Sequence, residues 1–324
     1  MSRLYLRPTG FVDAPFGFDG QVLRLAGGLS WFSAVEAIRV ADGRRVEQGL
    51  VPVERLDTLG EEAQPIIARL TAPRPPLRLG ARTIPLDQPR IMGILNVTPD
   101  SFSDGGAHAD DPAGAAEAGM KMLEAGAALL DIGGESTRPG AAIVWEADEI
   151  ARVRPVIERL AAGGAAISID TRKAAVMEAA LDAGAGLVND VSALKWDDRS
   201  AEVLAARDCP VVLMHQRPKP EGRTDVLIEV HDWLEDRIEW AEERGIDRER
   251  IIVDPGLGAG SFGKNVRDNL ALINGLALLH GLGRPILLGA SRKTFIGAIG
   301  GEAPVEHRLG GSIATALAGA VQGA

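Results

Sequence analysis

Residues 91–106 read Ile91-Met92-Gly93-Ile94-Leu95-Asn96-Val97-Thr98-Pro99-Asp100-Ser101-Phe102-Ser103-Asp104-Gly105-Gly106. The first five residues are apolar without polar alternation, which is typical of a strand buried on both faces. The segment after Asn96, with its proline and paired glycines, predicts a loop that can order over a bound ligand. The stretch therefore predicts a buried strand that ends at a polar loop.

The same alternation continues to the end of the chain. Further apolar runs lie at Ala127–Ile132, Ala165–Ile169, Gly186–Val188, Val211–Met214, Ile251–Val253 and Pro285–Leu288. The segments between them have helical spacing, as in Leu227, Val230, Leu234, Ile238 and Ala241. Repeated strand–helix units predict an α/β protein with a parallel sheet.

Polar residues follow nearly every apolar run. They are Asn96, Gly133-Gly134-Glu135, Asp170, Asn189-Asp190, His215, Asp254 and Ser291-Arg292-Lys293. A doubly wound sheet gathers its ligand site at one switch point, whereas a barrel uses the ends of all its strands. We therefore predict a (β/α)8 TIM-type barrel. Seven strand–helix units can be counted before Ala324, so we expect this chain to lack the eighth strand and the last helix.

The N-terminal quarter of the chain has a different pattern of apolar and polar residues. Short apolar pieces and a helix-prone segment around Glu61–Leu70 precede the proline cluster Pro73, Pro75 and Pro76. Prolines at this density mark a boundary, and residues 77–86 then read as a short hairpin turning at Gly80. We expect residues 1–76 to form a small α+β accessory domain of unknown role, and residues 77–324 to form the barrel.

Composition limits the class of protein. The net charge is −10, with 35 Lys and Arg against 45 Asp and Glu, which argues against a nucleic-acid-binding surface. The single cysteine, Cys209, excludes an internal disulfide framework and is typical of a reducing compartment. No signal-peptide pattern and no membrane-length apolar run is seen. We expect a cytoplasmic protein.

Taken alone, each polar residue has an ordinary structural alternative. Asn96 offers an amide oxygen suited to Mg²⁺, but asparagine more often satisfies loop backbone groups. Asp170 is suited to recognition of an N–H edge, or to capping a helix that begins near Arg172. Asp254 precedes Pro255-Gly256, where a role in the turn competes equally.

The motifs taken together resemble the dihydropteroate synthase family. They are the 91–106 stretch, Asp131-Ile132-Gly133-Gly134-Glu135-Ser136-Thr137-Arg138-Pro139-Gly140, Ile169-Asp170-Thr171, Val188-Asn189-Asp190, Leu213-Met214-His215, Asp254-Pro255-Gly256 and Gly289-Ala290-Ser291-Arg292-Lys293. The resemblance covers residues 77–324. It implies a transferase that joins a dihydropterin diphosphate to p-aminobenzoate with Mg²⁺. It also implies a homodimer and a target of sulfonamides.

The resemblance also assigns roles. Asn96 is the expected magnesium contact at the diphosphate, and Asp100 and Phe102 contribute to loop closure and the p-aminobenzoate wall. Thr137 and Arg138 are expected beside the diphosphate and p-aminobenzoate. For the pterin, the implied residues are Asp170, Asn189, Met214, Asp254 and Lys293. Ser291 and Arg292 are expected at the p-aminobenzoate carboxylate. The residues expected to carry catalysis are Asn96, Asp100, Arg138 and Lys293.

The sequence departs from the family pattern in the loop after Asp254 and at the end of the barrel. That loop is three residues longer, which changes the position of Phe262, a further expected substrate contact. The family's eighth strand carries an Arg-Val-His-Asp-Val motif that does not appear before Ala324, so we expect a truncated chain rather than a defective copy. The alternatives are a pterin-binding methyltransferase barrel and a non-catalytic pterin-binding homologue.

Overall fold

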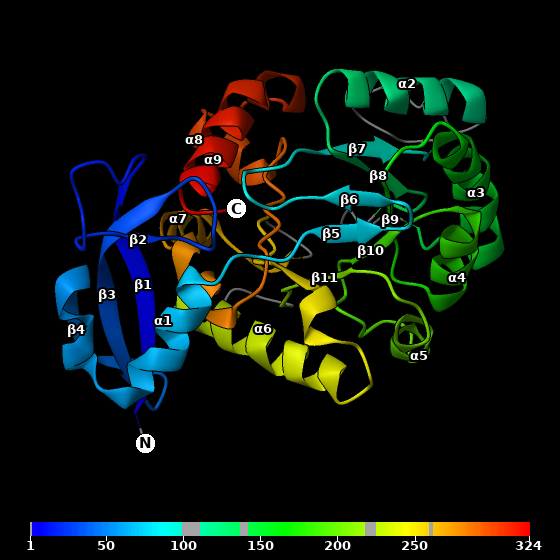
Figure 1. Ribbon diagram of the computed structural model, residues 1–324. Coiled ribbons are helices and arrows are strands. Elements are labelled where there is room, and N and C mark those ends of the chain that lie inside the picture. Colours follow the sequence, from blue (N-terminus) through cyan, green and yellow to red (C-terminus); the bar gives the residue numbers. More distant parts are fainter. Residues whose placement is uncertain (1, 99–110, 137–141, 218–224, 259–261) are drawn as a thin grey trace.

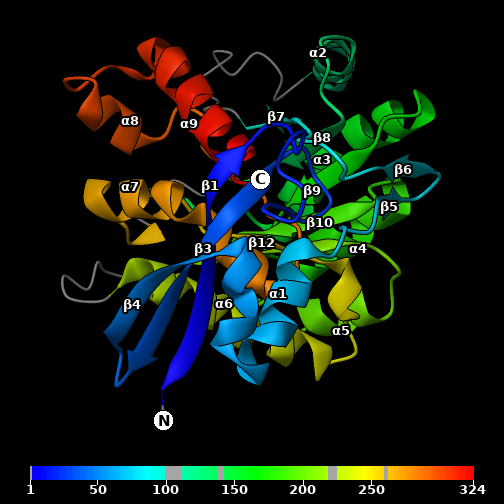
Figure 2. The ribbon, with the colours of Figure 1, turned by 60° about the vertical axis from the view of Figure 1, so that its left-hand side comes forward.

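The computed structural model describes residues 2–98, 111–136, 142–217, 225–258 and 262–324. Figure 1 shows an antiparallel N-terminal sheet on one side and a parallel sheet surrounded by helices on the other. Figure 2 brings the N-terminal sheet forward and shows it lying against the barrel. The predicted α/β class is confirmed by the parallel sheet.

The N-terminal sheet is built around one long strand. Its strands are β1 (Arg3–Val12), β2 (Leu23–Arg24), β3 (Trp31–Ala41) and β4 (Arg44–Pro52), and all the others pair with β3 in antiparallel fashion. Two short 3-10 helices, η1 (Val53–Leu59) and η2 (Glu61–Ala63), lead into α1 (Gln64–Thr71). Leu6, Phe32, Val35 and Leu70 are buried together, so this sheet and α1 have a small core of their own.

Polar contacts join the N-terminal sheet to the barrel helices. The Tyr5 hydroxyl donates to Asp232 Oδ1 over 2.8 Å, and Arg74 Nη2 lies 3.2 Å from His280 Nδ1. The Arg45 guanidinium pairs with Asp225, the residue that caps a barrel helix. The two parts are therefore tied together at several points on one face of the barrel.

A short hairpin follows the proline cluster. Its strands are β5 (Leu77–Leu79) and β6 (Arg82–Ile84), and Gly80 turns between them with φ +58°. This confirms the predicted hairpin. Leu79 and Ile84 pack against Leu129 and Leu187, so the hairpin covers the apolar interior at the amino ends of the barrel strands.

The parallel sheet runs in sequence order. Its strands are β7 (Met92–Asn96), β8 (Leu129–Gly133), β9 (Ile167–Asp170), β10 (Leu187–Asp190), β11 (Val211–Met214) and β12 (Ile251–Asp254). The seventh apolar run is less regular than predicted. It makes one parallel bridge, between Ile286 and Val253, with two flanking backbone hydrogen bonds. Within the described ranges, no strand pairs with the outer edge of β7.

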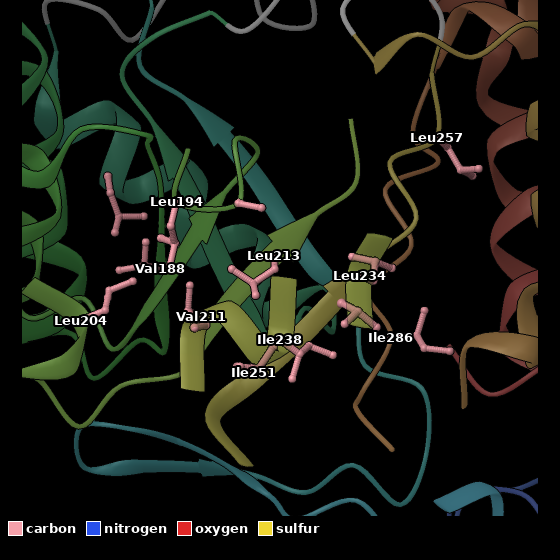
Figure 3. Close-up of a cluster of buried hydrophobic side chains, with 14 of the residues drawn as sticks. Val188, Leu194, Leu204, Val211, Leu213, Leu234, Ile238, Ile251, Leu257 and Ile286 are labelled. Carbon is pink, nitrogen blue, oxygen red and sulfur yellow. The ribbon is translucent and has the colours of Figure 1, made fainter. Parts of the chain in front are cut away.

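The helices cover the outside of this sheet. They are α2 (Pro112–Glu124), α3 (Glu146–Ala162), α4 (Ala174–Ala183), α5 (Ser200–Ala205), α6 (Val226–Glu242), α7 (Val266–Asn274), α8 (Thr294–Ile299) and α9 (Leu309–Val321), with 3-10 segments η3 (Arg248–Arg250), η5 (Leu276–Leu282) and η6 (Val305–Arg308). Figure 3 shows part of the shared core, where Leu213 of β11 lies near Leu234 and Ile238 of α6. The outward side chains of each strand therefore supply the apolar core.

The inward side chains lie in rows that the register fixes. Asn96, Gly133, Asp170 and Asn189 pair in succession across β7 to β10, at the carboxyl ends of the strands. One row deeper, toward the amino ends, come Ile94, Asp131, Ser168 and Leu187. Met214 and Asp254 pair at the ends of β11 and β12. The barrel interior is therefore polar at the carboxyl ends and apolar at the hairpin end.

Gly186 gives a direct test of the hairpin's contact with the barrel. A side-chain carbon at this position would lie 2.6 Å from Leu79 Cα and 2.8 Å from its carbonyl carbon, so the backbone of β5 would have to move. We expect Gly186→Ala to lower the free energy of unfolding by about 1–3 kcal/mol, measured by chemical denaturation. Gly49→Ala is the matched control, because nothing lies within 4 Å of its added carbon. Equal stability of the two variants would contradict this packing.

Candidate active site

The carboxyl ends of the barrel strands gather most of the predicted residues. Asn96, Asp170, Met214 and Asp254 end four of the six strands, and Asn189 is the last residue but one of β10. Phe262, Ser291, Arg292 and Lys293 follow in the segments after β12 and after the seventh apolar run. Active sites of (β/α) barrels lie at this end of the strands. The candidate residues Asp100, Phe102, Thr137 and Arg138 lie outside the described residues.

Gly133 brings two of these side chains close together. A carbon added at Gly133 would lie 3.2 Å from Asn96 Oδ1 and 3.7 Å from Asp170 Oδ2. The two side chains therefore flank the same point of the barrel mouth, and only a residue without a side chain leaves that point open.

Asp170 is free of the helix-capping role that its position also allowed. The helix α4 begins at Ala174, and the Ala174 amide donates to Asp197 Oδ2 over 2.9 Å instead. Asp170 Oδ1 is buried and has no hydrogen-bond partner among the described residues. Burial raises the pKa of Asp170 well above its ordinary value, and the neighbouring carboxylate of Asp131 adds to the effect. Such a group gains most from a ligand that donates a hydrogen bond.

Asp254 has both of the roles considered for it. Its Oδ1 accepts from the Gly256 amide over 2.6 Å, so it stabilises the turn. Its Oδ2 faces Gly289, where an added carbon would lie 3.5 Å away. Burial raises the pKa of Asp254, while the Gly256 amide and the positive charge of Lys293 lower it. One oxygen is thus held in place, and the other is directed toward the segment that leads to Lys293.

Lys293 supplies positive charge to this end of the barrel. Its Nζ lies 4.6 Å from the centre of the Phe262 ring, close enough for a cation–π interaction. Burial lowers the pKa of Lys293, and the carboxylates of Asp254 and Asp170 raise it. The longer loop after Asp254 therefore still brings Phe262 to the site.

Arg292, the residue before Lys293, has a strained backbone that α9 holds in place. Arg292 has φ +51°, which is uncommon for a residue with a side chain. Its amide donates to Ser312 Oγ over 2.8 Å, and its carbonyl accepts from Arg308. Ser291 is exposed. Strained backbone of this kind is concentrated at functional sites.

Lys264 is a site residue that was not predicted from the sequence. Its Nζ lies 2.9 Å from His215 Nδ1 and donates to the carbonyls of His215 and Phe262 over 3.2 and 3.3 Å. Burial lowers the pKa of Lys264 to about 7 and that of His215 to about 2, so the imidazole is a neutral acceptor. Lys264 therefore joins the loop after β11 to the loop that carries Phe262. The Gly-Lys pair in the sequence was the available signal.

A second buried ion network follows β8. Lys173 Nζ donates to Glu135 Oε1 over 3.0 Å and to the Val144 carbonyl over 2.8 Å, and it also pairs with Glu149. Thr171 donates to the same glutamate over 2.8 Å. This network fixes the chain that leaves β8 against the start of α3 and α4.

Asn96 fits the requirements of a magnesium contact. Its amide has no hydrogen-bond partner among the described residues, and Mg²⁺ takes few protein ligands beside substrate phosphates.

The described residues contain one cluster of metal-binding side chains, His231, Asp232 and Glu235, on α6. Arg3 pairs with both of those carboxylates, so this cluster forms ion pairs with the N-terminal sheet.

No described helix is long and apolar enough to cross a membrane.

Comparisons with known proteins agree with this arrangement. Residues 92–324 match the family model described as pterin binding enzyme. The chain is 46% identical over 234 residues to the dihydropteroate synthase of Bacillus subtilis, covering 72% of this chain and 80% of that protein. It is 41% identical over 249 residues to that of Escherichia coli, covering 75% and 86%.

Solved structures give the same result. The Xanthomonas albilineans dihydropteroate synthase with 4-aminobenzoic acid matches with a TM-score of 0.72 at 48% identity, over 78% of this chain and 90% of that one. The Yersinia pestis enzyme in a sulfonamide drug complex matches with a TM-score of 0.72 at 41% identity, over 77% and 91%. The chain therefore belongs to the dihydropteroate synthase family of pterin-binding enzymes.

Proposed function

We propose that this chain joins 6-hydroxymethyl-7,8-dihydropterin diphosphate to p-aminobenzoate, giving 7,8-dihydropteroate and diphosphate in folate biosynthesis. The observation that carries the proposal is the set of hydrogen-bond acceptors at the strand ends beside the half-buried Lys293. Asp254 is buried and Asp170 is half-buried, both have raised pKa values, and Lys293 is the cation next to them. A Xanthomonas albilineans relative in complex with 7,8-dihydropteroate supports it.

Asp254, Asp170 and Asn189 recognise the pterin. A pterin edge offers a ring N–H beside an exocyclic amine, and a carboxylate can accept both. Asp254 is the main anchor, because one of its oxygens is already fixed by the turn. Met214 packs against the ring face, and Lys293 donates to the ring carbonyl and nitrogen.

The other substrate groups lie toward the loops. Thr137 and Arg138 contact the diphosphate, and Ser291 and Arg292 hold the carboxylate of p-aminobenzoate. Phe262 and Phe102 line its ring, and Asp100 closes the loop. Asn96 would hold Mg²⁺ at the diphosphate. Mg²⁺ held there would supply positive charge to the leaving diphosphate.

The reaction needs no protein nucleophile. The bond between the pterin methylene carbon and the diphosphate oxygen breaks, and its electron pair leaves with diphosphate. The positive charge is spread into the pterin ring. The p-aminobenzoate nitrogen then forms the new bond to that carbon and releases a proton. The chain's own contribution is alignment and electrostatic stabilisation.

Two further properties follow the family. We propose a homodimer formed through the last helices, because Leu309, Ile313, Leu317 and Val321 form an exposed apolar stripe along α9. We also propose that residues 1–76 form an accessory domain beside the barrel, and that the protein is cytoplasmic.

Diphosphate release tests the activity. Incubation of the purified chain with the dihydropterin diphosphate, p-aminobenzoate and Mg²⁺ should release diphosphate only when p-aminobenzoate is present. A sulfonamide should compete with p-aminobenzoate, and a chelator should stop the reaction reversibly. Release that is independent of p-aminobenzoate would contradict the proposal.

Asp254→Asn tests the pterin anchor. The amide replaces one acceptor oxygen with a donor, so a donor pair on the ligand loses a partner. We expect affinity for the dihydropterin diphosphate, measured by calorimetry, to fall about tenfold to a hundredfold. Asp208→Asn is the control, because Asp208 is exposed and outside the site. Affinity within threefold of the unchanged chain would show that the anchor is assigned to the wrong residue.

A further inference from the structure

Asp131 lies beneath the proposed pterin residues. It occupies the second inward row, where the register pairs it with Ser168 of β9. It is 5% exposed, and Asn189 Nδ2 donates to its Oδ2 over 2.8 Å. The contact reaches from β8 to β10 across the strand between them. Asp131 thus touches a site residue from below.

The hydrogen bond fixes the direction of an amide. A carboxylate only accepts, whereas an asparagine amide donates at one end and accepts at the other. Because Nδ2 of Asn189 is turned toward Asp131, its Oδ1 is turned the other way. This oxygen has no hydrogen-bond partner among the described residues. It is therefore available as an acceptor.

The surroundings of Asp131 in this row show that its burial lowers the stability of the fold. Asp131 Oδ1 and the Ser168 hydroxyl oxygen are buried without a hydrogen-bond partner in the described part of the chain. Burial raises the pKa of Asp131, and the nearby Ser168 hydroxyl and the amide of Asn189 lower it. A buried carboxylic acid with an unpaired oxygen lowers the stability of the fold. A packing role alone therefore does not explain why an aspartate lies at position 131.

We infer that Asp131 is a positioning residue that turns the carbonyl oxygen of Asn189 toward the bound pterin. The pterin would then meet an acceptor at this point, matched to a ring N–H or amino group. Asp131 acts only through Asn189 and does not touch the substrate. The inference rests on the proposed function, because it assumes that Asn189 contacts the pterin.

A double-mutant cycle separates this role from a structural one. Asp131→Asn keeps the shape of the side chain but lets the Asn189 amide turn over. We expect it to weaken binding of 6-hydroxymethyl-7,8-dihydropterin diphosphate at least about tenfold by calorimetry. Asn189→Ala should weaken binding to a similar or greater extent. In the double variant the losses should not multiply, because two residues that act as a unit are not additive.

An exchange of the two side chains gives a second test. Asn189→Asp alone places two carboxylates together and should lose affinity. Combined with Asp131→Asn, the amide donates to the new carboxylate, whose second oxygen still faces the ligand, so affinity should recover to within about threefold of the unchanged chain. This test remains informative if Asp131→Asn alone unfolds. Asp208→Asn, which changes an exposed carboxylate outside the site, is the control and should bind normally.

The outcomes distinguish the inference from the function on which it rests. An unchanged chain that binds no pterin would overturn both. Normal pterin binding with multiplying losses in the cycle, or with no rescue by the exchange, would overturn only the role of Asp131. The Michaelis constant for p-aminobenzoate should stay within about twofold in Asp131→Asn, whereas general damage to the barrel would raise it as well.

Discussion

The parallel pairing of β7 to β12 is the constraint on which the rest of the structure depends. Side chains along each strand alternate between the helix layer and the barrel interior. Because neighbouring strands are in parallel register, Asn96, Gly133, Asp170 and Asn189 are brought into one row, although the first and the last are 93 positions apart (189 − 96). A slip of one residue in any strand would move its polar end into the apolar helix layer.

Burial then gives the residues at and below the carboxyl ends of the strands their chemical character. Asp131, Asp170 and Asp254 all have pKa values raised by burial, and Lys293 has a pKa lowered by it. Each group is costly to keep charged without a partner. A ligand with several N–H donors and an acceptor can form hydrogen bonds with the carboxylates and with the lysine at the same time. The same residues that weaken the empty barrel are therefore those that gain most from a pterin.

The loops beyond the strands are held by contacts that reach across the site. Lys264 ties two of them together through His215, and Ser312 of α9 supports the strained Arg292. The catalytic end of the barrel is therefore positioned by residues that do not themselves need to touch a substrate. This division matches the general need for rigid support behind a binding site.

The strands, their polar ends and the hairpin at Gly80 could be predicted from the sequence, because each depends on a local pattern of apolar and polar residues. The roles of the site residues follow from the family resemblance rather than from any local pattern. The contact of Asp131 with Asn189 and that of Lys264 with His215 could not be predicted. They join residues 58 and 49 positions apart, through side-chain geometry that no local pattern encodes. The seventh apolar run was predicted as a strand but forms a single bridge, because it pairs with β12 on one side only among the described strands.

The central claim is that the polar rows at the carboxyl ends of the strands bind a pterin. A crystal structure of the chain with the dihydropterin diphosphate tests it most directly. The account predicts the ring against Asp254, Asp170 and Asn189, with its face on Met214. The barrel also has an apolar cavity at the opposite, hairpin end, lined by residues that include Met92, Leu187 and Ile252. A pterin bound in that cavity, with the carboxyl-end residues untouched, would contradict the account.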